Sequence, residues 1–196
     1  MLPFSAASER NKEPIFSVLG PALAGRSRVL EIGSGTGQHA VYFSRQLPHL
    51  TWQPTDRADG LDGLAACVSQ SGCPNLLAPL ELDVTQATWP ALSPDAVFTA
   101  NTLHIMSWPE VEALFAGLGR ILGPGALLAI YGPFRYAGAH TAPSNEAFDH
   151  GLRQRDPASG VRDYEAVARL ASAQGLVPEA DHGMPANNRL VMWLRP

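Results

Sequence analysis

The feature that most constrains this chain is an apolar segment that runs into three alternating glycines. Residues 29–32 read Val-Leu-Glu-Ile, and Gly33, Gly35 and Gly37 follow. A helical pattern of apolar residues begins at about Gly37 and continues to Leu47. Glycine is favoured where the backbone takes a positive φ, or where a ligand must come closer than a Cβ allows. Because the next helix starts with unpaired N–H groups, the pattern predicts a strand, a ligand-binding turn and a helix.

Segments typical of strands and helices alternate along the rest of the chain. The expected strands are residues 28–32, 51–55, 76–82, 96–100, 126–131, 176–181 and 190–194. The expected helices start at Pro14, Gly37, Asp59, Ser107, Asn145 and Asp163. This alternation predicts an α/β fold with a doubly wound, mostly parallel seven-stranded sheet. The short connection at residues 183–188 makes the last two strands an antiparallel pair.

Prolines and glycines set the expected boundaries of these elements. Gly20-Pro21 is expected to interrupt or bend the first helix, and Pro79 indicates that the third strand is at a sheet edge or starts late. Ser107-Trp108-Pro109-Glu110 combines a capping box with a proline at the first helical position, which predicts a helix start. Residues 132–144 are expected to form a long loop, so the regular alternation ends after residue 131.

The composition is typical of a globular protein. At 196 residues, 45% hydrophobic and 16% charged, the chain fits one domain over residues 1–196, with residues 1–25 as an N-terminal helix or lid. Without a membrane-length apolar run or a secretory pattern, it is expected to be a soluble cytoplasmic protein with no membrane partner. A net charge of −4 with a single lysine disfavours a nucleic-acid partner. Cys67 and Cys73 lack metal-type spacing, so no metal site is expected.

The positions that follow each strand are expected to meet in one crevice. In doubly wound sheets, ligands bind beyond the carboxyl ends of the strands. These positions are Gly33–Gly37, Asp56, Asp83, Asn101–His104 and Tyr131–Tyr136. The crevice is therefore the predicted site of function.

An acidic residue at the end of the second expected strand indicates which kind of ligand the glycine turn binds. Asp56 lies about twenty residues further on, where a carboxylate can accept hydrogen bonds from both ribose hydroxyls. The dinucleotide fingerprint needs Gly or Ala at position 38, and Gln38 there leaves a nicotinamide-dependent oxidoreductase as a weaker alternative. Glu31 is an unusual acid for a buried strand, and a carboxylate satisfied by nearby N–H groups is its structural alternative.

Glu31-Ile32-Gly33-Ser34-Gly35-Thr36-Gly37 resembles the first motif of class I S-adenosylmethionine (SAM)-dependent methyltransferases. Asp56 and Leu82-Asp83-Val84 resemble the second and third motifs. This resemblance covers roughly residues 27–131 and implies the Rossmann-like methyltransferase fold.

The flanking segments resemble a small methyltransferase-like family that has long been described as a domain of unknown function. The segments that carry this resemblance are Ser8–Ile15, Gly37–Ala40, Trp52–Pro54, Tyr131–Pro133, Ser144-Asn145 with Phe148-Asp149, and Met184–Asn188. The resemblance covers nearly the whole chain and implies a cofactor and a fold without a substrate.

The resemblance implies SAM as the cofactor. The glycines would pass its methionine part with Glu31 near the amino group, Asp56 would hold the ribose, and Asp83 and Val84 would hold the adenine. Asn101 would lie near the methyl group. The implied cofactor-binding residues are Arg10, Glu31, Gly33, Ser34, Gly35, Gly37, Asp56, Asp83, Val84 and Asn101.

Catalysis of methyl transfer needs a positioned nucleophile and, where that nucleophile must lose a proton, a base. His104 is the best-placed candidate base, because a neutral imidazole accepts a proton near pH 7. Its alternative is a histidine that packs against the following helix and is hydrogen-bonded. Tyr131 is the second candidate catalytic residue and would help to shape the acceptor pocket.

Further residues are candidates for contact with the methyl acceptor. They are Asn11, Phe134, Arg135, Tyr136, Asn187 and Asn188. Asn187 and Asn188 have turn residues as their alternative role, and His140 is either a pocket residue or part of a solvated loop. The charged residues 8–13 form either a solvated leader or a lid over the cofactor.

The leading hypothesis is therefore a SAM-dependent methyltransferase that acts on a small-molecule thiol, hydroxyl or amine, as a monomer or a homodimer. Its alternative is a non-catalytic SAM-binding protein that works through a partner. Asn101-Thr102-Leu103-His104 lacks the Asn/Asp-Pro-Pro-Tyr type of signature that would identify an amino-group acceptor, so both hypotheses stay open.

Overall fold

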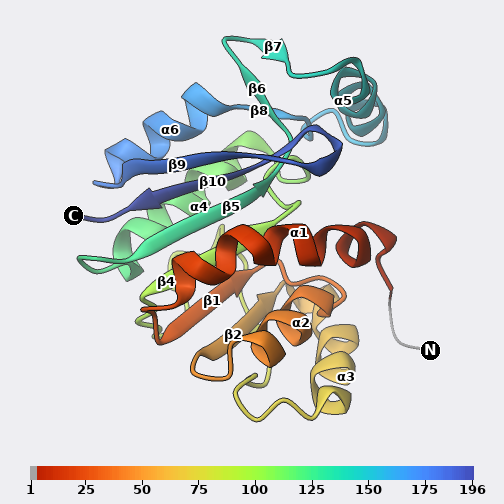
Figure 1. Cartoon of the computed structure of the whole chain (residues 1–196). Helices are drawn as coiled ribbons and strands as arrows, with labels where there is room; N and C mark the ends of the chain where they lie inside the picture. The colour runs from red at the N-terminus through yellow and green to blue at the C-terminus, as the bar shows by residue number, and fades with distance from the viewer. Residues whose placement is uncertain (1–3) are drawn as a thin grey trace.

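A seven-stranded sheet forms the centre of the computed structural model, which describes residues 4–196 (Figure 1). Its strands are β1 Arg28–Ile32, β2 Thr51–Asp56, β3 Leu80–Glu81, β4 Ala96–Ala100, β5 Leu127–Gly132, β9 Val177–Met184 and β10 Asn188–Leu194. Their order across the sheet is β3-β2-β1-β4-β5-β10-β9. Strands β1 to β5 are parallel, and β10 is antiparallel to β5 and to β9. The predicted α/β fold with an antiparallel C-terminal pair is confirmed.

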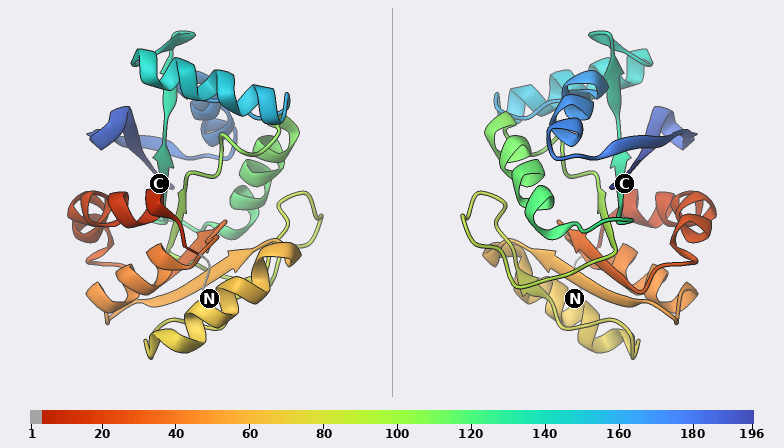
Figure 2. Two further views of the ribbon diagram at one scale, coloured as in Figure 1. Left: turned by 90° about the vertical axis from the view of Figure 1, so that its right-hand side faces the viewer. Right: turned by 90° about the vertical axis from the view of Figure 1, so that its left-hand side faces the viewer.

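Helices cover both faces of this sheet (Figures 1 and 2). They are α1 Ala6–Leu23, α2 Gln38–Gln46, α3 Leu61–Ser71, α4 Trp108–Ile121, α5 Pro143–Arg155 and α6 Tyr164–Ala173, with short 3₁₀ turns η1 Ala58–Gly60 and η2 Pro185–Asn187. Apolar residues of α1 and α2 form one core cluster with the sheet, and those of α4 and α6 form another on the opposite face. Alternate residues of β1 enter the two clusters, since successive side chains of a strand point to opposite faces.

The first helix starts earlier than the position of Pro14 indicated. It begins at Ala6, where the hydroxyl of Ser5 accepts a hydrogen bond from the Ser8 N–H at 3.2 Å. It also runs without interruption through Gly20-Pro21 to Leu23, which corrects the expected break. Packing outweighs the cost of a proline here, because the apolar stripe of α1 is almost completely buried against the sheet.

The third strand is much shorter than the expected residues 76–82. Pairing with β2 starts at Leu76, where the Leu77 N–H donates to the Trp52 carbonyl at 2.9 Å, and regular pairing appears only at Leu80–Glu81. Between Leu77 and Leu80, Pro79 has no N–H to donate to β2. The Gln53 Nε2 donates a hydrogen bond to the Ala78 carbonyl at 2.8 Å instead. The proline therefore breaks this edge strand in its middle.

Residues 132–144 were expected to be a loop, and this expectation is wrong. They contain β6 Phe134–Tyr136 and β7 Ala139–His140, and β6 pairs with both β7 and β8 Arg162–Asp163 in a second, three-stranded sheet. Helix α5 begins at Pro143 in place of the expected Asn145. Because the partner strand β8 follows more than twenty residues later, the local sequence carries no sign of this pairing.

The described residues 4–196 include no helix with both the length and the apolar character needed to cross a bilayer.

Candidate functional site

A cavity of about 520 Å³ lies at the carboxyl ends of the parallel strands. Its walls come from α1, from the glycine turn after β1, from the ends of β2 and β4, from the segment after β3, and from α4 and α5. The lining residues are Ser5, Ala7, Ser8, Ile32–Thr36, His39, Asp56, Arg57, Leu82–Val84, Ala100–Thr102, His104–Met106, Glu110 and Phe148. This is the crevice that the sequence predicted, and its volume suits a small organic ligand.

The glycine turn presents bare backbone to this cavity. Gly33 has a φ of +70°, and a Cβ built there would lie 3.0 Å from the side chain of Thr102. Gly35 has a φ of +54° with nothing within 4 Å of such a Cβ, so it faces open space. Gly37 does not line the cavity; it lets α2 approach α3, where a Cβ would meet Leu64 at 3.0 Å. The turn therefore offers room for a ligand beside the start of α2.

Asp56 lies at the end of β2 and supports the glycine turn. Its Oδ2 accepts a hydrogen bond from the Gly35 N–H at 2.6 Å, and its Oδ1 accepts one from the Arg57 N–H at 2.8 Å. A carboxylate has about four acceptor positions, so each oxygen retains a free lone pair. Two hydroxyl groups of a ligand in the cavity could therefore bond to Asp56.

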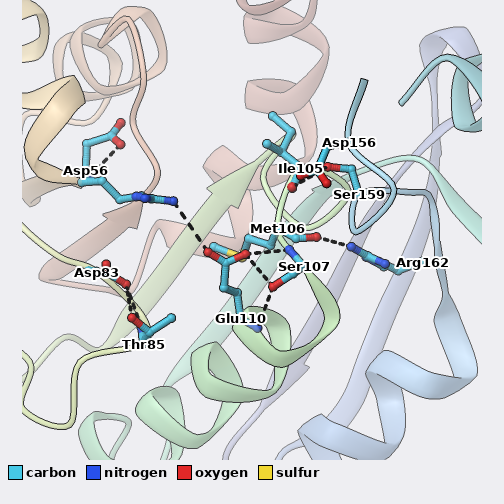
Figure 3. A network of polar contacts seen from close by, with 11 residues as sticks. Asp56, Asp83, Thr85, Ile105, Met106, Ser107, Glu110, Asp156, Ser159 and Arg162 are labelled. Atoms are coloured by element: carbon cyan, nitrogen blue, oxygen red, sulfur yellow. Dashed lines mark hydrogen bonds and ion pairs between the residues drawn. The ribbon is translucent and has the colours of Figure 1, made fainter. Parts of the chain in front are cut away.

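Asp83 and Val84 follow β3 on the same wall. The Asp83 Oδ1 accepts hydrogen bonds from the Thr85 N–H at 2.9 Å and from its hydroxyl at 2.7 Å (Figure 3). The hydrogen bond from the Thr85 side chain lowers the pKa of Asp83, which keeps this carboxylate ionised. Its second oxygen is left to accept from a ligand, with Val84 as an apolar surface beside it.

Asn101 ends β4 in a left-handed conformation with a φ of 58°. Few side chains other than glycine adopt this conformation, and asparagine is among those that tolerate it. Its N–H donates to the Tyr131 carbonyl at 2.8 Å, which ties the turn to the neighbouring strand β5. Asn101 thus redirects the chain along the cavity wall, and such strained residues cluster at functional sites.

Glu31 lies beneath the glycine turn and does not line the cavity. It is 1% exposed, and its carboxylate accepts a hydrogen bond from the Trp52 indole N–H at 2.9 Å. Burial raises the pKa of Glu31 to about 7, while hydrogen bonds from Trp52 and Ser34 oppose this rise. The donors are side chains, whereas the structural alternative from the sequence had proposed backbone N–H groups.

The first turn of α1 closes the cavity over the glycine turn. Gln38 connects the two, because its Oε1 accepts from the Ser5 N–H at 2.6 Å and from the Thr36 hydroxyl at 3.0 Å. Its Nε2 donates to the Glu9 carboxylate at 2.9 Å. The charged residues 8–13 are part of helix α1, and Glu9, Arg10 and Glu13 among them are exposed. Ser5 and Ser8 line the cavity in this arrangement.

Asn11 and Tyr131 meet beside this wall, on the α1 face of the sheet. The His39 Nε2 donates to the Asn11 Oδ1 at 2.6 Å, and burial lowers the pKa of His39 to about 4, so the ring is neutral. Burial raises the pKa of Tyr131, and hydrogen bonds from Asn11 and Asn188 oppose this rise. Of these residues only His39 lines the cavity, so the hydroxyl of Tyr131 is engaged outside it.

His104 lines the cavity from the loop between β4 and α4. It is 6% exposed, and the edge of the Phe148 ring contacts it with a centroid distance of 5.2 Å. Burial, followed by the nearby cations Arg162 and Arg155, lowers the pKa of His104 to about 4. The ring is therefore a neutral imidazole at pH 7, and within residues 4–196 no protein hydrogen bond contributes to its pKa.

Residues 159–162 hydrogen-bond to the loop that carries His104. The carbonyls of Leu103, His104, Ile105 and Met106 accept hydrogen bonds from the Arg162 Nε, the Gly160 N–H, the Ser159 hydroxyl and the Arg162 Nη2, respectively. Figure 3 shows Arg162 beside Met106 and Ser159 beside Ile105. Four consecutive carbonyls are thus satisfied, which fixes the loop in one position.

Several residues that the sequence nominated lie away from the cavity. Arg10 is exposed on α1 and Phe134 is buried in the core. The Arg135 guanidinium pairs with Asp163 at 2.6 Å, and the Tyr136 hydroxyl donates to Asp181 at 2.8 Å.

Asn187 and Asn188 belong to the turn between β9 and β10. The Asn187 carbonyl accepts from the Asn145 side chain at 2.9 Å, and the Asn188 side chain donates to the Pro185 carbonyl at 3.2 Å. Asn187 therefore docks on α5, whereas Asn188 begins β10 and also hydrogen-bonds Tyr131. Neither residue lines the cavity.

Other cavity residues were not nominated from the sequence. They are Ser5, Ser8, His39, Arg57, Ile105, Met106, Glu110 and Phe148. Thr36 and Thr102 also line it, and they lie within the segments after β1 and β4 that were expected to form the crevice. Phe148 comes from α5, which follows β6 and β7 of the second sheet in the chain. No local sequence pattern indicates that this helix lines the cavity.

The chain matches the family model described as protein of unknown function (DUF938) over residues 2–195. The chain belongs to this family. The match confirms the resemblance of the flanking segments to a family of unknown function.

Solved structures of methyltransferases share this fold. An O-methyltransferase family protein from Burkholderia thailandensis superposes with a TM-score of 0.84 at 17% identity, covering 96% of this chain and 57% of that protein. The mitomycin 7-O-methyltransferase MmcR has a TM-score of 0.84 at 18% identity, with coverages of 97% and 55%. Human N-acetylserotonin methyltransferase in complex with SAM has a TM-score of 0.80 at 13% identity, with coverages of 96% and 52%. The chain thus has the Rossmann-like methyltransferase fold and spans just over half the length of these proteins.

Proposed function

We propose that this protein is a SAM-dependent methyltransferase that acts on a small-molecule acceptor. The observation that carries the proposal is the set of residues that line one cavity. An open glycine turn, the carboxylate of Asp56, the carboxylate of Asp83 and the strained Asn101 all line it. Proteins with the same fold include methyltransferases, one of them described in complex with SAM.

The residues present fit this cofactor. Asp56 retains two free lone pairs for the ribose hydroxyls, and Asp83 has a free oxygen for the adenine amino group. Gly35 leaves open space where the methionine part would pass the start of α2. When bound, SAM supplies a methyl group on a sulfonium sulfur, which a lone pair of an acceptor can attack.

The chain's own groups would position the acceptor and take up its proton. His104 is neutral at pH 7, so its imidazole can accept a proton from a hydroxyl or thiol. Asn101 would lie near the methyl group, and the first turn of α1 would exclude water from the cavity. Arg10, Gly37 and Glu31 would act on the cofactor only through the elements that they support, because none of them lines the cavity.

Calorimetric titration with SAM, S-adenosylhomocysteine and NAD tests the proposed cofactor. We expect the first two to bind and NAD to fail. The Asp56→Ala variant should lose at least tenfold in affinity for both, since two hydrogen bonds to a charged group are removed. The Asp62→Ala variant, which changes an exposed aspartate of α3 outside the cavity, should bind as the wild type does.

Two results would count against this proposal. Binding of NAD in place of SAM would favour the oxidoreductase alternative. Tight SAM binding without methyl transfer to any thiol, hydroxyl or amine of a broad panel would favour the non-catalytic alternative.

A further inference from the structure

Two large apolar side chains are exposed beside His104. Ile105 is 61% exposed and Phe148 is 40% exposed, and both line the cavity. They come from the loop after β4 and from α5, so the tertiary fold brings them together. With Met106 they make this end of the cavity apolar. Exposed apolar side chains grouped in a concave site indicate an apolar ligand.

Among residues 4–196, no uncompensated charge lies at this end of the cavity to recognise a charged ligand. The charged side chains on the cavity wall are Asp56, Arg57, Asp83 and Glu110. The two aspartates are assigned to the cofactor in the proposed function. The Arg57 Nη1 lies 3.6 Å from the Glu110 Oε1, so these two charges compensate each other.

A buried cation lies behind the wall that carries His104. Arg162 is 8% exposed, and its guanidinium donates to the carbonyls of Leu103, Met106 and Ala158. No carboxylate of residues 4–196 lies within ion-pair distance of it. Asp149 and Asp156 offset part of its charge, whereas Arg153 and Arg135 add to it. At His104 the charges of Arg162 and Arg155 dominate, so this wall disfavours a cation.

We infer that this end of the cavity, bounded by His104, Ile105, Met106 and Phe148, is the acceptor subsite, and that it takes an uncharged apolar molecule methylated on oxygen or sulfur. This inference rests on the proposed function and adds the class of acceptor. Phe148 is then a specificity-determining residue, because its ring forms part of the subsite wall and contacts His104.

The chemistry of the step explains the preference for oxygen or sulfur over nitrogen. The acceptor's lone pair forms a bond to the methyl carbon while the carbon–sulfur bond of SAM breaks, and its electron pair stays on the sulfur. The hydroxyl or thiol proton goes to the His104 imidazole and from there to solvent, because burial and the charges of Arg162 and Arg155 disfavour a lasting imidazolium. The negative charge that develops on oxygen or sulfur is stabilised by the field of Arg162. An aliphatic amine is already a cation at pH 7, so it has no lone pair for the attack and its charge is disfavoured at this apolar wall.

Binding to the protein with S-adenosylhomocysteine, where no turnover occurs, tests the subsite directly. We would titrate naphthol, naphthoate and naphthylmethylamine at pH 7 by calorimetry, with and without S-adenosylhomocysteine. Naphthol is neutral and the other two are charged, while all three share one ring system. We expect naphthol to bind at least tenfold more tightly than either charged probe.

Two variants separate the subsite from general surface effects. Phe148→Ala should weaken naphthol binding about tenfold, since it removes a partly buried ring, and leave S-adenosylhomocysteine binding unchanged. Leu77→Ala is the matched control, because Leu77 is 42% exposed and lies outside the cavity. It should change neither affinity.

Methyl transfer from SAM to naphthol, naphthalenethiol and naphthylmethylamine then tests the acceptor atom. Faster transfer to the amine than to the hydroxyl or thiol would overturn the inference. The inference would also be overturned if a charged probe bound as tightly as naphthol or more tightly, or if the Phe148→Ala and Leu77→Ala variants had equal effects. It would be overturned as well if naphthol failed to bind while S-adenosylhomocysteine bound normally. Failure of S-adenosylhomocysteine to bind would instead contradict the proposed function, which keeps the two outcomes distinct.

Discussion

His39 on α2 and Asn11 on α1 are joined by a hydrogen bond of 2.6 Å from the imidazole Nε2 to the amide Oδ1. His39 lines the cavity, whereas Asn11 belongs to the helix that covers it. The bond therefore couples the wall of the candidate site to the position of α1. Asn11 also hydrogen-bonds Tyr131, so the coupling continues to strand β5.

Replacing Asn11 by alanine should destabilise the protein by about 1–3 kcal/mol. The buried Nε2–H of His39 would lose its acceptor, and an unsatisfied buried donor costs about this much. Glu13→Ala on the exposed side of the same helix is the control and should change stability by less than about 0.5 kcal/mol. Urea unfolding measures both variants, and equal unfolding midpoints would show that the bond adds no net stability.

Replacing Gln38 by alanine should loosen the first turn of α1 without unfolding the protein. Its side chain makes the hydrogen bonds to Ser5, Thr36 and Glu9 that join this turn to the glycine turn. Amide exchange of residues 5–12 should become at least tenfold faster, and affinity for S-adenosylhomocysteine should fall several-fold, because ordering α1 then opposes binding.

The control for Gln38 is Gln46→Ala, an exposed glutamine at the end of the same helix α2. It should alter neither exchange nor affinity. Unchanged exchange at residues 5–12 in the Gln38→Ala variant would mean that packing alone holds α1 in place.

Glu31→Gln should change how stability depends on pH. Burial raises the pKa of Glu31 from 4.5 to about 7 in the folded protein, so the folded state binds the proton more tightly than the unfolded state does. The wild type should therefore lose stability as pH rises from about 4.5 through 7, by on the order of 3 kcal/mol. The glutamine variant keeps an acceptor for Trp52 and lacks this loss.

Unfolding in urea at several pH values between 4.5 and 8 measures the effect. The buried histidines contribute equally to both proteins, so the difference between the two curves isolates Glu31. Parallel curves would show that the carboxylate of Glu31 is ionised in the folded protein across this range.

Turnover should be insensitive to the titration of His104 near neutral pH. Burial and the nearby arginines lower its pKa from 6.5 to about 4, so the neutral, proton-accepting form dominates above about pH 5. The rate should fall only as pH drops through this lowered value. A rate profile with a midpoint near 6.5 that disappears in His104→Ala would contradict this assignment of the pKa.

His104→Ala should lower kcat by about 100-fold while the affinity for SAM stays within twofold, since general base catalysis contributes about this much. The ring contacts Phe148 and is not assigned to the cofactor, so binding of SAM serves as the internal control. Unchanged turnover would return His104 to its structural alternative.

Much of the fold could be predicted from local patterns. The run before Gly33, the capping box at Ser107–Glu110 and the short connection before β10 all act within a few residues, and the structure confirms the elements that they predicted. Misjudged boundaries depend on distant contacts. Helix α1 continues through Pro21 because its apolar side is buried against the sheet. Strand β6 pairs with β8, although helix α5 separates these two strands in the sequence.

The sequence alone determined the edge of the sheet on which the candidate site lies. Parallel strands end on one side, so residues after those strands, such as Gly35, Asp56 and Asn101, had to meet there. Only the tertiary structure decided that Phe148 faces the cavity and that Tyr136 and Arg135 do not. The reason is physical: strand ends follow from local periodicity, whereas the direction of α5 and the second sheet depends on pairing between segments that are far apart in the chain.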